Sequence, residues 1–425
     1  MGIIKKQGAQ NTIIVYFGIL IGFASLLFIQ PHFLRTRDLG LIRILLSYAS
    51  LLAAIFPMGG PSIAVKYLPK FYAPEKKHNG FFGLLLVFPL VGIILGCTCL
   101  FFVKDWIVSL YIEKSRLFTD YLFLGAPLAI FITLIYTLNS YCNAILKTVF
   151  PSFLNDIINR VLLIIVIVLY YFKVYDLNGF VLAFVATYGV QAFLLSVYIF
   201  MFGQAGFKPD INYLQEHVGF RFMVRYSLIL SFTSVSSVSL KFLDSMFLGK
   251  QSLEAVGVYS VAAFIALIIE TPLNSLERVA NSTISHNLAV NNFEEIKKIY
   301  YTSSRYLMLL GGFLSALIVI SINDLLLLLP AEYHTAGLVT IIISAGSFIN
   351  MATGINYPIL INSSKYVWGS VFLFILLVLA FVSNYFLVPR YGMLGAAIAT
   401  AGSSSVYNLL KYFFIWKNFK MQPFN

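Results

Sequence analysis

The run Ile13–Ile29, IIVYFGILIGFASLLFI, decides the fold class because it contains no charged residue. A helix of about 20 apolar residues spans the roughly 30 Å hydrocarbon layer of a bilayer. Similar runs recur along all 425 residues, of which 60% are hydrophobic and 11% are charged, and the mean hydropathy is +0.87. Soluble domains carry about 25% charged residues. The sequence therefore predicts an integral membrane protein, and continuous rather than alternating apolar runs predict helices.

Apolar windows bounded by charged residues, Pro, Gly or Asn predict about twelve transmembrane helices. The first window follows Lys5 and Lys6, as a secretory signal would, but the many later windows favour a first span. The expected fold is all-α, a polytopic membrane protein with two six-helix lobes around a central cavity. The predicted spans are 12–30, 40–59, 80–103, 118–140, 151–172, 178–202, 222–247, 255–278, 302–322, 335–360, 366–388 and 393–416.

An internal repeat supports the two lobes. Asn178–Gly189, NGFVLAFVATYG, resembles Tyr391–Gly402, YGMLGAAIATAG, and each opens the last helix of a six-helix set. A polar segment, Gly203–Gly219, separates the sixth and seventh windows. We expect an N-terminal lobe at 1–203, a cytoplasmic linker at 204–221 and a C-terminal lobe at 222–425. Because six is an even number, both lobes enter the membrane in the same direction, with a pseudo-symmetry axis along the membrane normal.

The distribution of basic residues predicts the topology. Lys and Arg are more frequent in the segments on the side of the N-terminus than on the opposite side. The positive-inside rule then places both termini in the cytoplasm. The rule also accounts for much of the net charge of +12 without a nucleic-acid partner.

Two charges lie in the fifth predicted span. Arg160 is near its middle, and Asp156 is one turn earlier, where an acid and a base can pair along one helix face. A charge at this depth is disfavoured by roughly 3 kcal/mol on insertion scales. One interpretation is a self-neutralised structural pair. The other places Arg160 in the cavity, where its guanidinium would bind phosphate oxygens.

Charges in other spans are further candidates. Glu270 precedes Thr271 and Pro272 in the eighth span, and a carboxylate beside a Pro-induced bend suits proton or cation coupling or pairing with a neighbouring helix. Lys241 and Asp244 lie late in the seventh span, where they can pair or extend to the interface. Arg43 lies early in the second span. We expect it either to anchor the helix at the membrane interface or to face the cavity as a cation. Hydroxyl side chains of the seventh span predict a cavity wall or a close helix contact: Ser231, Thr233, Ser234, Ser236, Ser237 and Ser239.

These residues give the predicted site. The substrate-binding candidates for a diphosphate are Arg160, Lys241 and Arg43, and the coupling-ion candidates are Glu270, Asp244 and Asp156. No catalytic residue is expected, because the chain contains no phosphate loop, nucleophile elbow or HExxH motif. The three Cys and five His are scattered and predict no metal site. We therefore expect a protein that is not an enzyme and has no cofactor apart from a coupling H⁺ or Na⁺.

Several segments resemble one family, the O-antigen and capsule polysaccharide flippases of the multidrug/oligosaccharidyl-lipid/polysaccharide exporter superfamily. They are Asn11–Thr12 with Gly18 and Gly22, Val65–Phe71, Leu243–Asp244, Val256–Ser260 and Val388–Thr400. The resemblance implies two lobes in a V around a cavity that opens alternately to each face. It implies a cargo of undecaprenyl-diphosphate-linked oligosaccharide, flipped from the cytoplasmic to the outer leaflet of the bacterial inner membrane for lipopolysaccharide or capsule synthesis. Membrane lipids and glycan-assembly enzymes would be the partners.

The sequence departs from that family in length, because similar flippases often continue to fourteen helices. The expectation is either a fragment or a natural twelve-helix member. Two other functions stay open. One is an ion-coupled multidrug or small-solute exporter of the same superfamily, with Glu270 or Asp244 binding Na⁺ or H⁺. The other is a membrane-embedded glycan polymerase or ligase, which the short predicted external loops disfavour.

Overall fold

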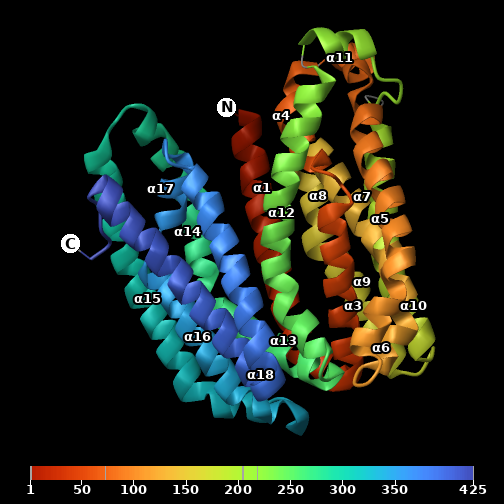
Figure 1. Ribbon diagram of the computed structural model, residues 1–425, viewed down its shortest axis with the longest axis vertical. Helices are drawn as coiled ribbons and strands as arrows, with labels where there is room; N and C mark the ends of the chain where they lie inside the picture. The colour runs from red at the N-terminus through yellow and green to blue at the C-terminus, as the bar shows by residue number, and fades with distance from the viewer. Residues whose placement is uncertain (1, 72, 203–204, 218, 425) are drawn as a thin grey trace. The chain divides into compact units, whose positions relative to one another are not determined.

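The computed structural model describes residues 2–71, 73–202, 205–217 and 219–424, and within them the chain forms helices and no strand (Figure 1). Eleven of the described helices are long and apolar enough to cross a membrane. Their outward surfaces carry large apolar side chains, such as Phe102 and Ile320, which are 77% and 78% exposed. Such surfaces suit contact with lipid rather than water. The predicted all-α membrane fold is confirmed.

The chain divides into two compact units, Met1–Phe242 and Leu243–Asn425. We call them unit 1 and unit 2. The division lies inside helix α12 (Phe220–Gly249), because the first part of α12 packs with unit 1. There, Lys66 lies 3.5 Å from the Tyr226 ring, and that ring lies 5.7 Å from the Tyr67 ring. The predicted boundaries at 203 and 222 stay a prediction, and residues 204 and 218 of the predicted linker lie outside the described residues.

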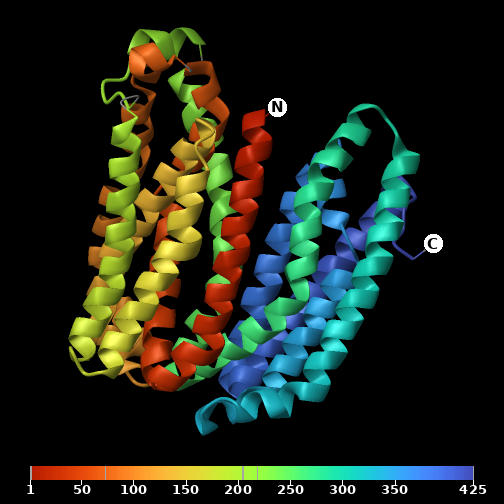
Figure 2. The same cartoon turned by 180° about the vertical axis from the view of Figure 1, so that it is seen from behind.

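Unit 1 contains six helical segments that match the first six predicted spans, followed by part of α12. In Figure 2, α1 lies beside the helices of the fifth span, and the two are in contact. The elements are α1 Gly2–Ala24, a π-helical turn at Ser25–Ile29, α2 Gln30–Phe33, α3 Thr36–Ile55, α4 Gly60–Phe71, α5 Phe81–Tyr111, α6 Arg116–Tyr121, α7 Gly125–Ala144, α8 Val149–Phe153, a second π-helical turn at Leu154–Ile158, α9 Asn159–Tyr171, α10 Leu177–Met201 and α11 Ile211–His217.

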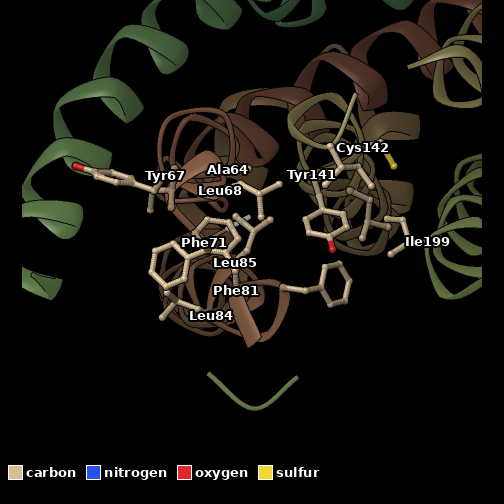
Figure 3. Packing of buried hydrophobic residues seen from close by; sticks show 14 of the residues in the cluster. Ala64, Tyr67, Leu68, Phe71, Phe81, Leu84, Leu85, Tyr141, Cys142 and Ile199 are labelled. Atoms are coloured by element: carbon tan, nitrogen blue, oxygen red, sulfur yellow. The ribbon is translucent and has the colours of Figure 1, made fainter. Parts of the chain in front are cut away.

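The buried cluster of unit 1 fixes α4 against its neighbours. Ala64, Leu68 and Phe71 of α4 are buried at helical spacing, while Lys66 and Lys70 are exposed on the other face. This amphipathic pattern is the reason α4 packs on one side only. Figure 3 shows its buried side chains packed against residues of α5 and α7, and Ile199 of α10 belongs to the same cluster.

Unit 2 contains the remaining spans. Its helices are α13 Leu253–Leu267, α14 Thr271–Ala289, α15 Phe293–Leu327, α16 Gly337–Ala352, α17 Asn356–Asn362 and α18 Val367–Phe419, with 3₁₀ turns at Ile268–Glu270 and Ala331–Ala336.

Helix α18 consists of two arms that meet at Gly392, where φ is +55°. The arms run antiparallel, because the Trp368 ring lies 5.4 Å from the Phe414 ring and the Ser383 hydroxyl lies 3.2 Å from the Ser403 hydroxyl. Glycine adopts positive φ without the steric cost that a side chain adds. The arms match the predicted spans 366–388 and 393–416.

The tenth span differs from its prediction. The apolar window predicts one helix over 335–360, whereas α16 ends at Ala352 and α17 begins at Asn356. Gly354, with φ +66°, lies in the break, and a Cβ atom there would collide with Ser304. The window covers both helices because their residues are equally apolar, and hydropathy does not register a change in backbone direction.

Gly354→Ala is expected to destabilise the protein by about 1–2 kcal/mol, because a side chain at positive φ is strained. The collision with Ser304 adds to this effect. Thermal unfolding of the protein in detergent measures it. Gly402→Ala is the matched control, since a Cβ at that helical glycine meets nothing within 4 Å. Equal unfolding midpoints for the two variants would contradict the structure at Gly354.

Candidate functional site

Asp244, near the end of α12, accepts hydrogen bonds from three residues of unit 2. The Tyr259 hydroxyl donates to Oδ2 at 2.5 Å, and the Thr400 hydroxyl donates to the same oxygen at 2.6 Å. The Asn384 amide donates to Oδ1 at 3.0 Å. Tyr259 lies on α13, whereas Asn384 and Thr400 come from the two arms of α18. We call these four residues the Asp244 cluster.

The Asp244 cluster is rich in oxygen atoms. Asn384 is fully buried, and its side-chain oxygen has no hydrogen-bond partner among the described residues. A carboxylate, an amide oxygen and two hydroxyls are the hard ligands that cations such as Na⁺ prefer. No group of three His, Cys, Asp or Glu side chains that could hold a metal occurs in the described part of the chain. The oxygen atoms of the cluster are of the kind that bind Na⁺ or a proton.

Unit 1 contains a cavity of about 480 Å³. Its lining comes from α3, the turn after α3, α4, α7 and α12, and includes no charged side chain. The lining residues are Ala53, Ala54, Pro57, Gly59, Pro61, Ser62, Tyr136, Asn139, Ser140, Asn143, Ser231, Ser234, Ser237 and Val238. We call it the unit 1 pocket.

The hydroxyl-rich face of the seventh span was predicted to line a cavity. Ser231, Ser234 and Ser237 line the unit 1 pocket, so the prediction is confirmed for these three residues. They recur every third residue and therefore share one helix face. Ser236 is buried and donates to the Phe232 carbonyl at 2.9 Å. The side chain of Thr233 lies outside the described residues.

Side-chain amides extend from the unit 1 pocket toward the fifth and sixth spans. The Asn139 amide donates to Asn155 Oδ1 at 3.4 Å, and Gln191 donates to the same oxygen. The side-chain oxygen of Asn139 is buried and has no hydrogen-bond partner among the described residues. Such an oxygen can accept a hydrogen bond from a solute hydroxyl in the pocket.

Arg160 and Asp156 lie where α1 meets the fifth span. The Arg160 guanidinium donates to the Gly18 carbonyl of α1. A Cβ atom on Gly18 would come within 2.7 Å of Asp156, and one on Gly22 would collide with Arg160. The two glycines therefore allow the close contact. Arg160 is half-buried and does not line the unit 1 pocket, so its predicted role in phosphate binding stays a prediction, as does the role of Asp156.

Arg43 and Lys241 have different surroundings. Arg43 is half-buried and donates to Gln30 at 2.7 Å, and Gln30 donates to Ser25 at 3.1 Å. Arg43 is thus part of a polar network inside unit 1 and is not an exposed residue at the membrane interface. Lys241 is exposed on α12, one turn after Ser237 and on the same helix face.

Glu270 lies at the end of the 3₁₀ turn before α14, and Asn350 of α16 donates to it at 3.0 Å. Pro272 lies in the first turn of the following helix, which begins at Thr271, and the predicted role of Glu270 in ion coupling stays a prediction. Sequence reasoning missed Asn384, Thr400 and Tyr259, although each is a polar residue inside an apolar window. It also did not single out Lys411, which is 4% exposed within α18.

The comparisons with known proteins agree on the fold. Residues 230–386 match the MatE family model. The structure is similar to an inward-facing multidrug resistance MATE family transporter of the MOP superfamily, with a TM-score of 0.73 and 12% identity over 95% of this chain and 94% of that chain. It is also similar to the lipid II flippase MurJ in an inward closed conformation, with a TM-score of 0.68 and 16% identity over 93% of this chain and 87% of that chain.

A third similar structure is the Vibrio cholerae MATE transporter VcmN in its bent form, with a TM-score of 0.57 and 15% identity over 99% of this chain and all of that one. No curated protein sequence matches significantly. The chain thus has the fold of MOP-superfamily transporters.

Proposed function

We propose that this protein is a MOP-superfamily transporter that flips undecaprenyl-diphosphate-linked oligosaccharide from the cytoplasmic to the outer leaflet by alternating access. The choice of this cargo rests on one observation. The unit 1 pocket has a largely apolar lining that carries hydroxyl and amide groups and no charged side chain. Sugars present many neutral hydroxyls, each both donor and acceptor, and such a lining complements them.

The diphosphate of this cargo needs a cation. Lys241 continues the pocket-lining face of α12 beyond Ser237. Its exposed ammonium has no hydrogen-bond partner among the described residues, whereas Arg43 donates to Gln30 and Arg160 donates to the Gly18 carbonyl. We therefore rank Lys241 first among the three predicted phosphate-binding residues. The polyprenyl tail needs no protein cavity, because it can remain in the lipid phase.

Arg160→Ala is expected to reduce the stability of unit 1 by about 1–3 kcal/mol, because the Gly18 carbonyl and Asp156 lose their cation. Thermal unfolding measures this loss. Flipping by the folded variant tests the predicted phosphate role separately. An unchanged flipping rate would exclude Arg160 as a phosphate ligand.

Coupling to a cation is the second part of the proposal. Asp244, Glu270 and Asp156 are the predicted coupling-ion candidates, and the oxygen-rich cluster around Asp244 favours Asp244. We propose that one H⁺ or Na⁺ binds there during each transport cycle. The site lies in unit 2, whereas the proposed sugar-binding pocket lies in unit 1.

A cation-coupled multidrug exporter is the alternative function. The fold supports it equally, because one of the similar structures is a multidrug resistance transporter. A cationic drug would be expected to bind beside a carboxylate, and the unit 1 pocket has none. A membrane-embedded glycan polymerase or ligase is the third candidate, and no structural observation favours it.

The deciding experiment uses the purified protein in vesicles of bacterial phospholipid. A fluorescent undecaprenyl-diphosphate oligosaccharide and a fluorescent organic cation are supplied in separate reactions under imposed H⁺ and Na⁺ gradients. We expect the oligosaccharide to become accessible to a membrane-impermeant reagent, and the dye to stay in place. Dye transport without oligosaccharide flipping would establish the alternative.

A further inference from the structure

Unit 2 contains a cavity of about 350 Å³ beside the point where α18 reverses direction. Pockets that bind small molecules span roughly 300–1,000 Å³. The walls of this cavity come from the end of α12, the turn that follows it, and the end of the first arm of α18. None of the four residues of the Asp244 cluster lines it. We call it the hairpin pocket.

A direct hydrogen bond joins the two walls of the hairpin pocket. The side-chain amide of Gln251, in the turn after α12, donates to the Val388 carbonyl of α18 at 2.7 Å. Pro389 follows and has no backbone N–H to donate within the arm. Gly392, with φ +55°, then allows the chain to reverse. The pocket is therefore formed by two segments that are 137 residues apart in sequence and are tied together in the fold.

Two cations and no carboxylate line the hairpin pocket. The cations are Lys250, directly after α12, and Arg390, at the end of the first arm of α18. The carboxylate of Glu254, the acidic residue next to Lys250 along the chain, does not line the pocket. Among the described residues, the one ion pair within 4.0 Å joins Lys298 to Glu295. The pocket therefore carries uncompensated positive charge, which attracts an anion.

The rest of the lining is largely apolar and aromatic. Phe247, Tyr385 and Phe386 contribute rings, and the last two are exposed. Because the two arms of α18 are antiparallel, their hairpin lies at the opposite end of unit 2 from the C-terminus (Figure 1). Aromatic rings at the ends of membrane helices lie at the level of the lipid head groups. The pocket therefore suits an anion that also carries apolar chains.

The predicted topology does not explain these two cations. With the termini in the cytoplasm, as predicted, the hairpin faces the outer side, where the positive-inside rule predicts fewer basic residues. Lys250 and Arg390 would also repel Na⁺, so the hairpin pocket is a poor entrance for a cation on its way to the Asp244 cluster. A bound anion accounts for both residues.

We propose that the hairpin pocket binds the phosphate of an anionic membrane lipid, with Lys250 and Arg390 as the phosphate ligands. The planar guanidinium of Arg390 can donate to two phosphate oxygens, and the ammonium of Lys250 supplies the second positive charge. The aromatic rings of the pocket pack against the first carbons of the lipid chains. A phosphate held by both cations bridges the end of α12 to the hairpin of α18. This binding does not depend on the proposed function, because it involves no oligosaccharide.

Native mass spectrometry of the full chain in detergent tests the lipid preference. The protein is titrated with phosphatidylglycerol, which is anionic, and separately with phosphatidylcholine, whose choline offsets the phosphate charge. We expect phosphatidylglycerol to bind at least about tenfold more tightly. A large excess of inorganic phosphate should not displace it, because free phosphate lacks the chains that contact the rings.

Lys250→Gln combined with Arg390→Gln tests the phosphate ligands. We expect this double variant to bind phosphatidylglycerol at least about tenfold more weakly, because the lipid loses both charged partners. Lys250→Arg keeps the charge and should retain binding. Thermal unfolding shows whether each variant is folded. If the double variant does not fold, the two single glutamine variants provide the same test.

Lys104→Gln is the matched control. The ammonium of Lys104 lies 5.1 Å from the centre of the Phe101 ring, much as that of Lys250 lies 5.5 Å from the centre of the Phe247 ring. Lys104 is on α5 of unit 1 and lies outside the hairpin pocket. We expect this variant to keep the affinity of the wild type for phosphatidylglycerol.

Four results would overturn the proposal. The wild type could bind the two lipids equally, or the folded glutamine variants could keep full affinity. Lys104→Gln could weaken binding as much as Lys250→Gln does, which would indicate a general attraction to surface charge. Inorganic phosphate could displace the lipid completely, which would identify a site for a free anion.

Discussion

Asp244→Asn is expected to lower cation-driven transport roughly 100-fold. The substitution keeps the size of the side chain but removes the charge that balances a bound cation. A charged interaction of about 3 kcal/mol in a buried site corresponds to that factor. Transport in vesicles under separate H⁺ and Na⁺ gradients measures the effect. The same variant should exchange cargo at equilibrium, because the unit 1 pocket is unchanged.

Asp324→Asn provides the control for Asp244→Asn, since Asp324 is an exposed carboxylate on α15. Tyr259→Phe removes one hydrogen bond to Asp244 and should reduce transport much less, by about tenfold at most. Gradient-driven transport at the wild-type rate in Asp244→Asn would remove Asp244 from the coupling mechanism.

Ser234→Phe is expected to slow flipping at least tenfold. Ser234 lines the unit 1 pocket, and a phenyl ring there would occupy space in the cavity of about 480 Å³ that the sugar needs. A tenfold effect corresponds to about 1.4 kcal/mol of lost binding in the transported state. The flipping rate at a fixed amount of reconstituted protein is the measurement.

Ser239→Phe is the matched control for Ser234→Phe, because Ser239 lies on the same helix but does not line the pocket. Thermal unfolding of both variants shows whether each remains folded. If the two folded variants flip at equal rates, the pocket is not on the transport path.

The spans were predictable because bilayer thickness sets the length of an apolar helix. Even the hairpin of α18 appeared as two windows, since Arg390–Gly392 interrupts the apolar run where the arms meet. The break at Gly354 was not predictable in this way. It depends on a positive φ and on a close approach to Ser304, which composition does not encode.

The partners of Asp244 could not be predicted from local sequence. Asn384 and Thr400 lie 140 and 156 residues away from it along the chain. Only the packing of α12, α13 and α18 in unit 2 brings them together. The polar character of Asn384 inside an apolar window was the available signal, because a buried amide in a membrane helix needs a partner.

Lys411 shows the limit of assigning charges by their position in the sequence. A lysine close to the C-terminus is expected at the membrane surface, where long basic side chains reach water. Lys411 is nevertheless 4% exposed, and its ammonium lies 4.1 Å from the centre of the Tyr407 ring. Arg43 and Arg160 were recognised as unusual, but their acceptors, Gln30 and the Gly18 carbonyl, lie on other helices.

The central claim is that the neutral pocket of unit 1 holds a sugar head group. Photo-crosslinking tests it most directly, with an undecaprenyl-diphosphate oligosaccharide that carries a photoactivatable group on its sugar, followed by mass spectrometry of the labelled peptides. We expect label on the peptides that contain Ser231–Ser237 and Asn139, and competition by unlabelled oligosaccharide. Label confined to other segments, or competition by an organic cation alone, would contradict it.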